Sequence, residues 1–170
     1  AFAQAGVPWT ASDALPLAAE PFVAACDLAV SCLFGNFTRA DLVQLLGSPL
    51  YDFGSGPLSP QAVAEFDAHL GRAQYFADRE RLAALAASFD EDAGVAEDEG
   101  DESASSRAVA SSVATILAAL PELDPPRRMS DYLSALHAFV ERFVRTGGHD
   151  LVEHERHLRA RRAQLDALAA

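Results

Sequence analysis

The spacing of the apolar residues constrains the fold of this chain more than any other feature of its sequence. Apolar side chains recur every three or four positions, the period that lines one face of an α-helix, and no stretch alternates apolar and polar residues over a strand's length. Alanine is the commonest residue and leucine is frequent, and both lose little entropy in a helix. We therefore predict an all-α fold.

The apolar stripes and the residues between them predict about seven helices. Each stripe is bounded by glycine, proline or a capping residue, as helix ends usually are. The predicted helices lie between Pro21 and Gly35, between Thr38 and Gly47, from Pro60 to about Leu70, over 78–89, over about 104–120, from Ser130 to Gly147, and over 150–169.

An acidic run divides the chain. Residues 90–102 hold eight acids, no base and two glycines, so we expect an acidic linker or a disordered loop there. Residues 1–89 would form an N-terminal helical half. Residues 103–170 would form a C-terminal half, whose three helices could pack as an antiparallel bundle. The length of 170 residues suits one compact domain made of both halves.

Charge is spread unevenly along the sequence. The net charge of -12 divides into -5 before residue 90, -8 over 90–102 and +1 from residue 103 onward. Because affinity for nucleic acid comes largely from neutralised phosphates, the chain as a whole is not an electrostatic DNA binder. Only the last third could offer phosphate a favourable face.

Four arginines gather near the C-terminus and are the candidate nucleic-acid contacts: Arg156, Arg159, Arg161 and Arg162. One interpretation is contact with a DNA backbone. The other is a solvated helix end, where positive charge is favourable and nearby carboxylates pair with it. The sequence leaves both interpretations open.

The candidate metal ligands are His149, Glu153 and His157, which follow one another at intervals of four on the last predicted helix. They would share one face and offer two imidazoles and a carboxylate. The outer two would lie about 12 Å apart at about 1.5 Å of rise per residue, too far to share one ion easily. The alternative is a solvated helix face with i,i+4 pairs. We therefore expect no metal and no other cofactor.

The common motifs of nucleotide and acyl chemistry are missing. The sequence contains no GxxxxGK[ST], no lysine and no GxSxG. Cys26 and Cys32 stand six apart, on different sides of a helix, and are typical of small buried residues in a reducing compartment. The longest apolar stretch, 22–34, is interrupted by Asp27 and Ser31. We expect a cytoplasmic protein without a catalytic site in these residues.

Three stretches together resemble one family. Ala5-Gly6-Val7-Pro8 resembles the aGIPy segment that follows the fourth motif of UvrD-like superfamily-one helicases, and Leu15-Pro16-Leu17-Ala18 then leads into an apolar helix. The run from Asn36 to Pro49, NFTRADLVQLLGSP, resembles the F-x-R-x-x-(V/L)-x-x-L-L-x-S-P run of AddB/RecC-type subunits of bacterial helicase–nucleases. The resemblance covers the chain up to Pro49.

The resemblance implies a helical insertion in the second motor domain of a DNA-repair protein. Arg39 and Ser48-Pro49 would set a helix and its end. ATP-binding residues would lie upstream and a PD-(D/E)XK nuclease domain downstream, so any helicase or exonuclease activity would belong to the parent protein. The opening at Ala1 instead of Met agrees with a piece of a longer chain. The expected role is docking on a partner helicase subunit, or guidance of duplex DNA.

Two other hypotheses remain at this point. The chain could be a free-standing helical module for protein interaction, as its neutral to acidic charge would allow. It could also be a metal-dependent helical enzyme that uses His149, Glu153 and His157.

Overall fold

The computed structural model describes residues 21–54, 56–95, 101–121, 126, 128–145, 159 and 162. They form six helices: α1 (Pro21–Phe34), α2 (Arg39–Gly47), α3 (Pro60–Arg72), α4 (Arg79–Val95), α5 (Asp101–Ala119) and α6 (Met129–Phe143). Within these residues, β-structure is limited to one bridge that pairs Tyr51 with Val144. The predicted all-α class is confirmed. The helix predicted over 150–169 lies outside the described residues, apart from Arg159 and Arg162, which are helical.

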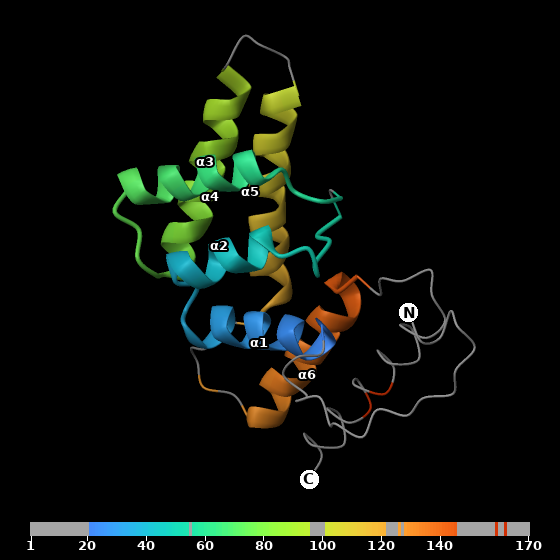
Figure 1. Ribbon diagram of the computed structural model, residues 1–170. Coiled ribbons are helices and arrows are strands. Elements are labelled where there is room, and N and C mark those ends of the chain that lie inside the picture. The colour runs from blue at the N-terminus through green and yellow to red at the C-terminus, as the bar shows by residue number, and fades with distance from the viewer. Residues whose placement is uncertain are drawn as a thin grey trace, which may run out of the picture.

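The helices are arranged around a long antiparallel pair (Figure 1). Helices α4 and α5 form this pair, and α1, α2 and α3 are stacked one above another across it. Helix α3 packs against both α4 and α5, α2 packs against α5, and α6 lies against α1 at the lower end. Within the described part, no helix is long and apolar enough to cross a membrane.

The buried apolar side chains form one cluster to which all six helices contribute. Fully buried members include Leu33 of α1, Leu42 of α2, Phe66 of α3, Leu82 of α4 and Val113 of α5. Residues on both sides of the acidic run therefore share one core.

The acidic run is the largest difference from the sequence-based expectation. Helix α4 continues through Asp90, Glu91 and Asp92 to Val95, and α5 already begins at Asp101. The disordered loop predicted for 90–102 is therefore wrong at both ends, while residues 96–100 lie outside the described part. Packing favours helix here, because the contact between α4 and α5 is the most extensive among the described helices.

The C-terminal helices do not pair as predicted. Helix α5 packs mainly against α4 and α3, whereas α6 packs mainly against α1. Helix α6 presents Phe139 to the segment that follows α2, where its ring lies 5.8 Å from that of Tyr51 and 6.2 Å from that of Phe53. This aromatic contact draws α6 away from α5, so the predicted bundle of 103–170 is absent between α5 and α6.

Two backbone hydrogen bonds to a distant segment end α6 at Phe143, earlier than the end that the sequence predicts at Gly147. The amide of Asp52 donates to the carbonyl of Phe143 at 2.8 Å, and the amide of Arg145 donates to the carbonyl of Leu50 at 2.8 Å. The side chains repeat the pairing, since Arg145 Nη2 lies 3.3 Å from Asp52 Oδ2. The helix therefore stops at Phe143 because its next residues pair with a distant segment.

The other helix ends follow local signals to differing degrees. Thr38 is the N-cap of α2 and its hydroxyl accepts from the amide of Asp41 at 3.3 Å, as its capping-box pattern predicts. Ser59 precedes Pro60 at the start of α3, but its side chain makes no capping hydrogen bond. Ser130 lies inside α6, whose N-cap is Arg128, so its predicted capping role is wrong.

Candidate functional site

Two loops that are far apart in the sequence meet at one corner of the molecule. The loop between α1 and α2 and the loop between α3 and α4 are joined by backbone hydrogen bonds, from the amide of Asp78 to the carbonyl of Asn36 at 3.2 Å and from the amide of Arg39 to the carbonyl of Phe76 at 2.9 Å. The buried Tyr75 hydroxyl also donates to the carbonyl of Phe37 at 2.6 Å. We call residues 35–39 and 73–78 the Phe76 corner.

The Phe76 corner holds the strained backbone of the described chain. Among the described residues, every non-glycine residue with positive φ lies in one of the two loops of the corner: Asn36 at 53°, Phe37 at 58°, Gln74 at 52° and Asp78 at 114°. Such conformations cost roughly 1–3 kcal/mol each and persist where the surroundings hold them, often at binding or catalytic sites. Here the Phe37 ring, 2% exposed, is locked in the core, which fixes the loop around it.

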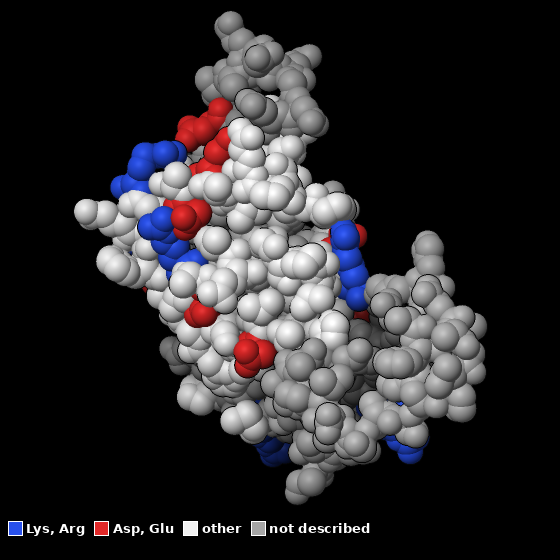
Figure 2. Space-filling view, in the orientation of Figure 1, with Lys and Arg blue, Asp and Glu red and all other residues white. Residues whose placement is uncertain are grey.

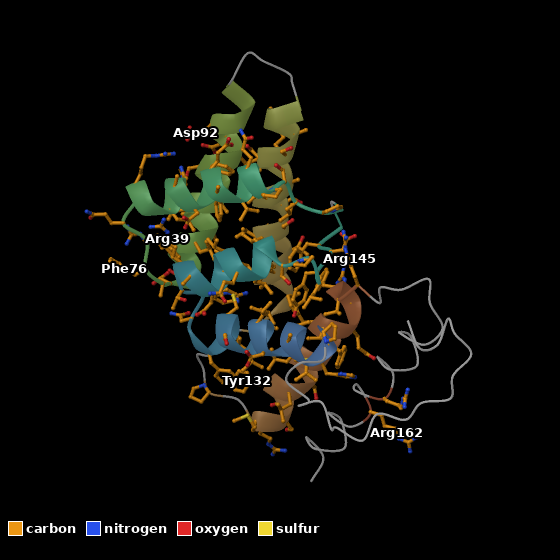
Figure 3. All side chains as sticks on the ribbon, viewed as in Figure 1. Arg39, Phe76, Asp92, Tyr132, Arg145 and Arg162 are labelled. Carbon is orange, nitrogen blue, oxygen red and sulfur yellow. The ribbon has the colours of Figure 1, made fainter. Side chains whose placement is uncertain are left out.

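Phe76 projects from this fixed frame into solvent. Its side chain is 81% exposed, more than any other large apolar side chain that the structure describes. Figure 3 shows it projecting from the loop between α3 and α4, on the same side of the molecule as Arg39. Because Tyr75 and the carbonyl of Phe76 are both bound to the α1–α2 loop, the exposed ring sits on rigid backbone.

A groove of about 940 Å³ runs beside Phe76 between α2 and α3. Its wall on α2 includes Ala40, Val43 and Gln44, and its wall on α3 includes Asp67 and Gly71. The surface of the groove is mainly apolar, although polar side chains such as Gln44 and Asp67 also line it. We call it the α2–α3 groove.

An ion pair closes one side of the α2–α3 groove. Arg39 Nε lies 2.6 Å from Asp67 Oδ1, and Arg39 Nη2 donates to Asp67 Oδ2 at 2.9 Å. The hydrogen bond from Arg39 lowers the pKa of the Asp67 carboxyl below its usual value. The guanidinium rests on Gly71, where an added Cβ would lie only 2.8 Å from Arg39 Nη1.

Two arginines next to the corner contact backbone carbonyls. Arg79 donates to the carbonyls of Leu117 and Leu120 at the end of α5, and its guanidinium lies 5.4 Å from the centre of the Phe37 ring. Arg81 donates from Nη2 to the carbonyl of Ala73. These arginines stabilise the fold and leave few donors free for a nucleic-acid backbone.

The sequence-predicted site residues lie elsewhere or outside the described part. Arg159 and Arg162 are exposed, while Arg156, Arg161, His149, Glu153 and His157 fall on residues that the structure does not describe. Within the described residues, no group of three or more His, Cys, Asp or Glu side chains could hold a metal ion.

Cys32 does not have the surroundings of a nucleophile. Neither Cys26 nor Cys32 forms a disulfide; Cys26 is partly buried and Cys32 is completely buried. Burial, with a smaller contribution from Asp41, raises the pKa of the Cys32 thiol to about 12. A thiol held in its protonated form is unreactive, so Cys32 acts as a core residue.

The residues behind the family resemblance are structural here. Phe37 is buried, Arg39 ties α2 to α3, and the hydroxyl of Ser48, the C-cap of α2, accepts from the amide of Leu50 at 3.2 Å. They set the start and the end of α2.

Sequence reasoning missed Phe76. The available signal was a pair of aromatic residues, Tyr75 and Phe76, between two predicted helices. That signal does not say which ring is buried, because the choice depends on the contact between Tyr75 and the distant Phe37.

Comparison with known proteins adds no identification. No protein-family model, curated protein or solved structure matches the chain.

Proposed function

We propose that this chain is a non-catalytic helical domain of an AddB-like DNA-repair helicase–nuclease, and that it serves to dock the protein on a partner helicase subunit in the cytoplasm. The domain has no ATP, metal or other cofactor site of its own in this proposal. Helicase or exonuclease activity belongs to the rest of the parent protein.

The observation that carries the docking role is the exposed Phe76 ring on a rigid corner beside an apolar groove. Exposed aromatic residues on fixed backbone are typical anchors of protein interfaces, because little conformational entropy is lost when they bind. In a helical linker that binds nothing, strained backbone and an exposed phenylalanine ring would cost free energy with no compensating contact.

The charges of the described residues favour protein docking over guidance of duplex DNA. The chain has a net charge of -12, and Arg39, Arg79, Arg81 and Arg145 all contact acceptors within the fold. Duplex DNA binding needs several basic groups directed at phosphates. Figure 2 shows acidic and basic groups together along the upper left edge, and few charged groups across the middle of this face.

Two measurements test the proposal. The complete gene product that contains residues 1–170 should carry helicase motifs or a PD-(D/E)XK core, and it should bind a superfamily-one motor subunit from the same genome in size-exclusion chromatography. A parent protein with neither feature, or one that binds no motor subunit, would contradict it.

A DNA-binding assay separates docking from DNA guidance. We expect the change of Arg156, Arg159, Arg161 and Arg162 to Ala to leave the affinity for duplex DNA, and its dependence on salt, unchanged. A large loss of affinity with a shallower salt dependence would favour the guidance role and place it in the C-terminal cluster.

A further inference from the structure

The fold holds α6 in the way that a groove holds a separate amphipathic helix. The buried side chains of α6 stand at positions i, i+4, i+7, i+8 and i+11 and form one apolar face: Tyr132, Leu136, Phe139, Val140 and Phe143. Helix α6 packs mainly against α1, whereas α5, the helix before it in the chain, packs mainly against α4 and α3 (Figure 1). Anchors at such spacings are typical of a helix that binds in an apolar groove of another protein.

Aromatic rings join α6 to the segment that follows α2. The ring of Phe143 lies 5.6 Å from that of Phe53, next to the contacts that Phe139 makes with Tyr51 and Phe53. The Tyr51 hydroxyl donates to the carbonyl of Ala25 in α1, so Tyr51 is tied to α1 by a bond that does not involve α6. The groove that receives α6 is therefore built from α1 and the segment around Tyr51 and Phe53.

Helix α6 is attached more weakly than the helices of the α4–α5 pair. The contact between α4 and α5 is the most extensive among the described helices, and α3 also packs against both. The end of α6 is joined to Leu50 and Asp52 by two backbone hydrogen bonds and by a partly exposed ion pair, and such ion pairs add little stability. An element that packs mainly on one neighbour opens at a lower free energy than the core.

We infer that α6 is an exchangeable helix, which leaves α1 while the other described helices stay packed and is replaced there by α6 of a second copy of the chain. The second copy is the occupant because its α6 carries the same buried side chains in the same order, so the exchanged contacts equal those within one copy. Exchange of an identical element is a low-cost route to a dimer. The charge of -12 on each copy opposes the dimer, and salt screens this repulsion. The inference does not depend on the proposed docking function.

Disulfide trapping between two copies tests the exchange. Leu50 faces Arg145 beside the bridge of Tyr51 with Val144, where facing Cα atoms lie about 5.5 Å apart, a separation that a disulfide spans. One copy of the complete gene product carries Leu50→Cys and the other carries Arg145→Cys, both with Cys26→Ser, and the mixture is oxidised. We expect a dimer linked through positions 50 and 145, identified by mass spectrometry, because an exchanged α6 brings these positions together from different copies.

A matched pair of cysteines separates exchange from random collision. In the control mixture, Ala87→Cys, at an exposed position of α4, takes the place of Leu50→Cys and should give no linked dimer with Arg145→Cys. The yield of the dimer linked at positions 50 and 145 should rise severalfold between about 0.05 and 0.5 M salt, because screening weakens the repulsion between two acidic copies.

Hydrogen exchange of the complete gene product tests whether α6 opens separately. Amides of α6 should exchange at least about 100-fold faster than those of α4 between Leu82 and Phe89, because they require only a local opening. Val109→Ala, at a fully buried position of α5, should accelerate exchange in α4 and α5 by about tenfold or more, because it leaves a cavity in the core. It should leave exchange in α6 unchanged.

Each outcome supports or overturns the inference. A dimer linked at positions 50 and 145, together with separate exchange of α6 and no dimer in the control mixture, supports it. Equal yields from the two mixtures would reveal collision alone and overturn it. Absence of the dimer overturns it even where α6 opens separately, and so does acceleration of α6 exchange by Val109→Ala to the same degree as in α4. Binding of a motor subunit bears on the docking function alone.

Discussion

The Phe76 corner and the α4–α5 pair place their apolar side chains in opposite ways. Along α4 and α5 the large apolar residues, such as Leu82, Val113 and Ile116, are buried, and exposed positions such as Ala87 and Ala114 are taken by small residues. At the corner, Phe37 and Tyr75 are buried but Phe76 projects into solvent. Strained φ angles within the described residues occur at the corner and not along α4 and α5.

The contrast distinguishes a region that stabilises the fold, the α4–α5 pair, from one whose conformation stability alone does not explain, the Phe76 corner. The α4–α5 pair satisfies helix propensity and burial together, so its residues need no further explanation. The corner violates both local rules, with left-handed conformations and an exposed aromatic ring, and such conflicts tend to occur at functional sites.

The largest expected effect compares two phenylalanines of the corner. Phe37→Ala should lower the free energy of unfolding by about 3–5 kcal/mol, since it empties a buried aromatic site, whereas Phe76→Ala should change it by less than about 0.5 kcal/mol. Urea unfolding monitored by circular dichroism measures both. A loss above about 1 kcal/mol for Phe76→Ala would assign Phe76 a structural role and remove the contrast.

The next effect compares Gly35, which precedes α2, with Gly47, the last residue of α2. A Cβ at Gly35 would lie 2.7 Å from the carbonyl oxygen of Ser31 and 2.6 Å from Asp41 Oδ2, whereas a Cβ at Gly47 would meet nothing within 4 Å. Gly35→Ala should therefore destabilise the protein by about 1–3 kcal/mol, as overpacking does. Gly47→Ala should stabilise it by up to about 1 kcal/mol through helix propensity. Thermal unfolding gives the two signs, and equal signs would contradict the described close approach at Gly35.

A third comparison introduces leucine at two different surface positions. Ala40→Leu adds bulk to the α2–α3 groove, and Ala87→Leu adds it to an exposed site on α4. We expect both variants to unfold within about 0.5 kcal/mol of the wild type, as exposed substitutions do. Only Ala40→Leu should weaken motor-subunit binding, by roughly tenfold in isothermal titration calorimetry, equivalent to about 1.4 kcal/mol. Equal affinities of the two variants would show that the groove is not the contact.

The smallest effect concerns pH. Because Arg39 lowers the pKa of Asp67 in the folded protein, this pair stabilises the fold above the unfolded carboxyl pKa. The contribution is lost as the pH falls from the unfolded pKa, near 3.8, through the lower folded value. Asp67→Asn should slightly reduce the dependence of stability on pH in that acidic range, whereas Asp27→Asn, at an exposed position of α1, serves as the control. The difference should be small, because the pair is partly exposed and water screens it. Identical pH profiles for Asp67→Asn and the wild type would show that the pair adds no stability.

Local sequence signals accounted for much of the fold. The period of the apolar residues identified the helices, and Thr38, Gly35 and Pro60 marked ends close to those observed, because capping and helix breaking involve only near neighbours. Long-range contact decided the rest. Helix α6 stops at Phe143 because it pairs with Leu50 and Asp52, and α4 extends beyond Phe89 because α5 packs along it.

The sequence by itself determined that this protein would be helical, which faces of its helices would be apolar, and that its charge would be acidic. The tertiary structure decided that Tyr75 is buried and Phe76 exposed, and that Arg39 meets Asp67 across the α2–α3 groove. The physical reason is distance along the chain. Periodicity acts over three or four residues, whereas the bond from Tyr75 to Phe37 and the pair of Arg39 with Asp67 join segments 38 and 28 residues apart.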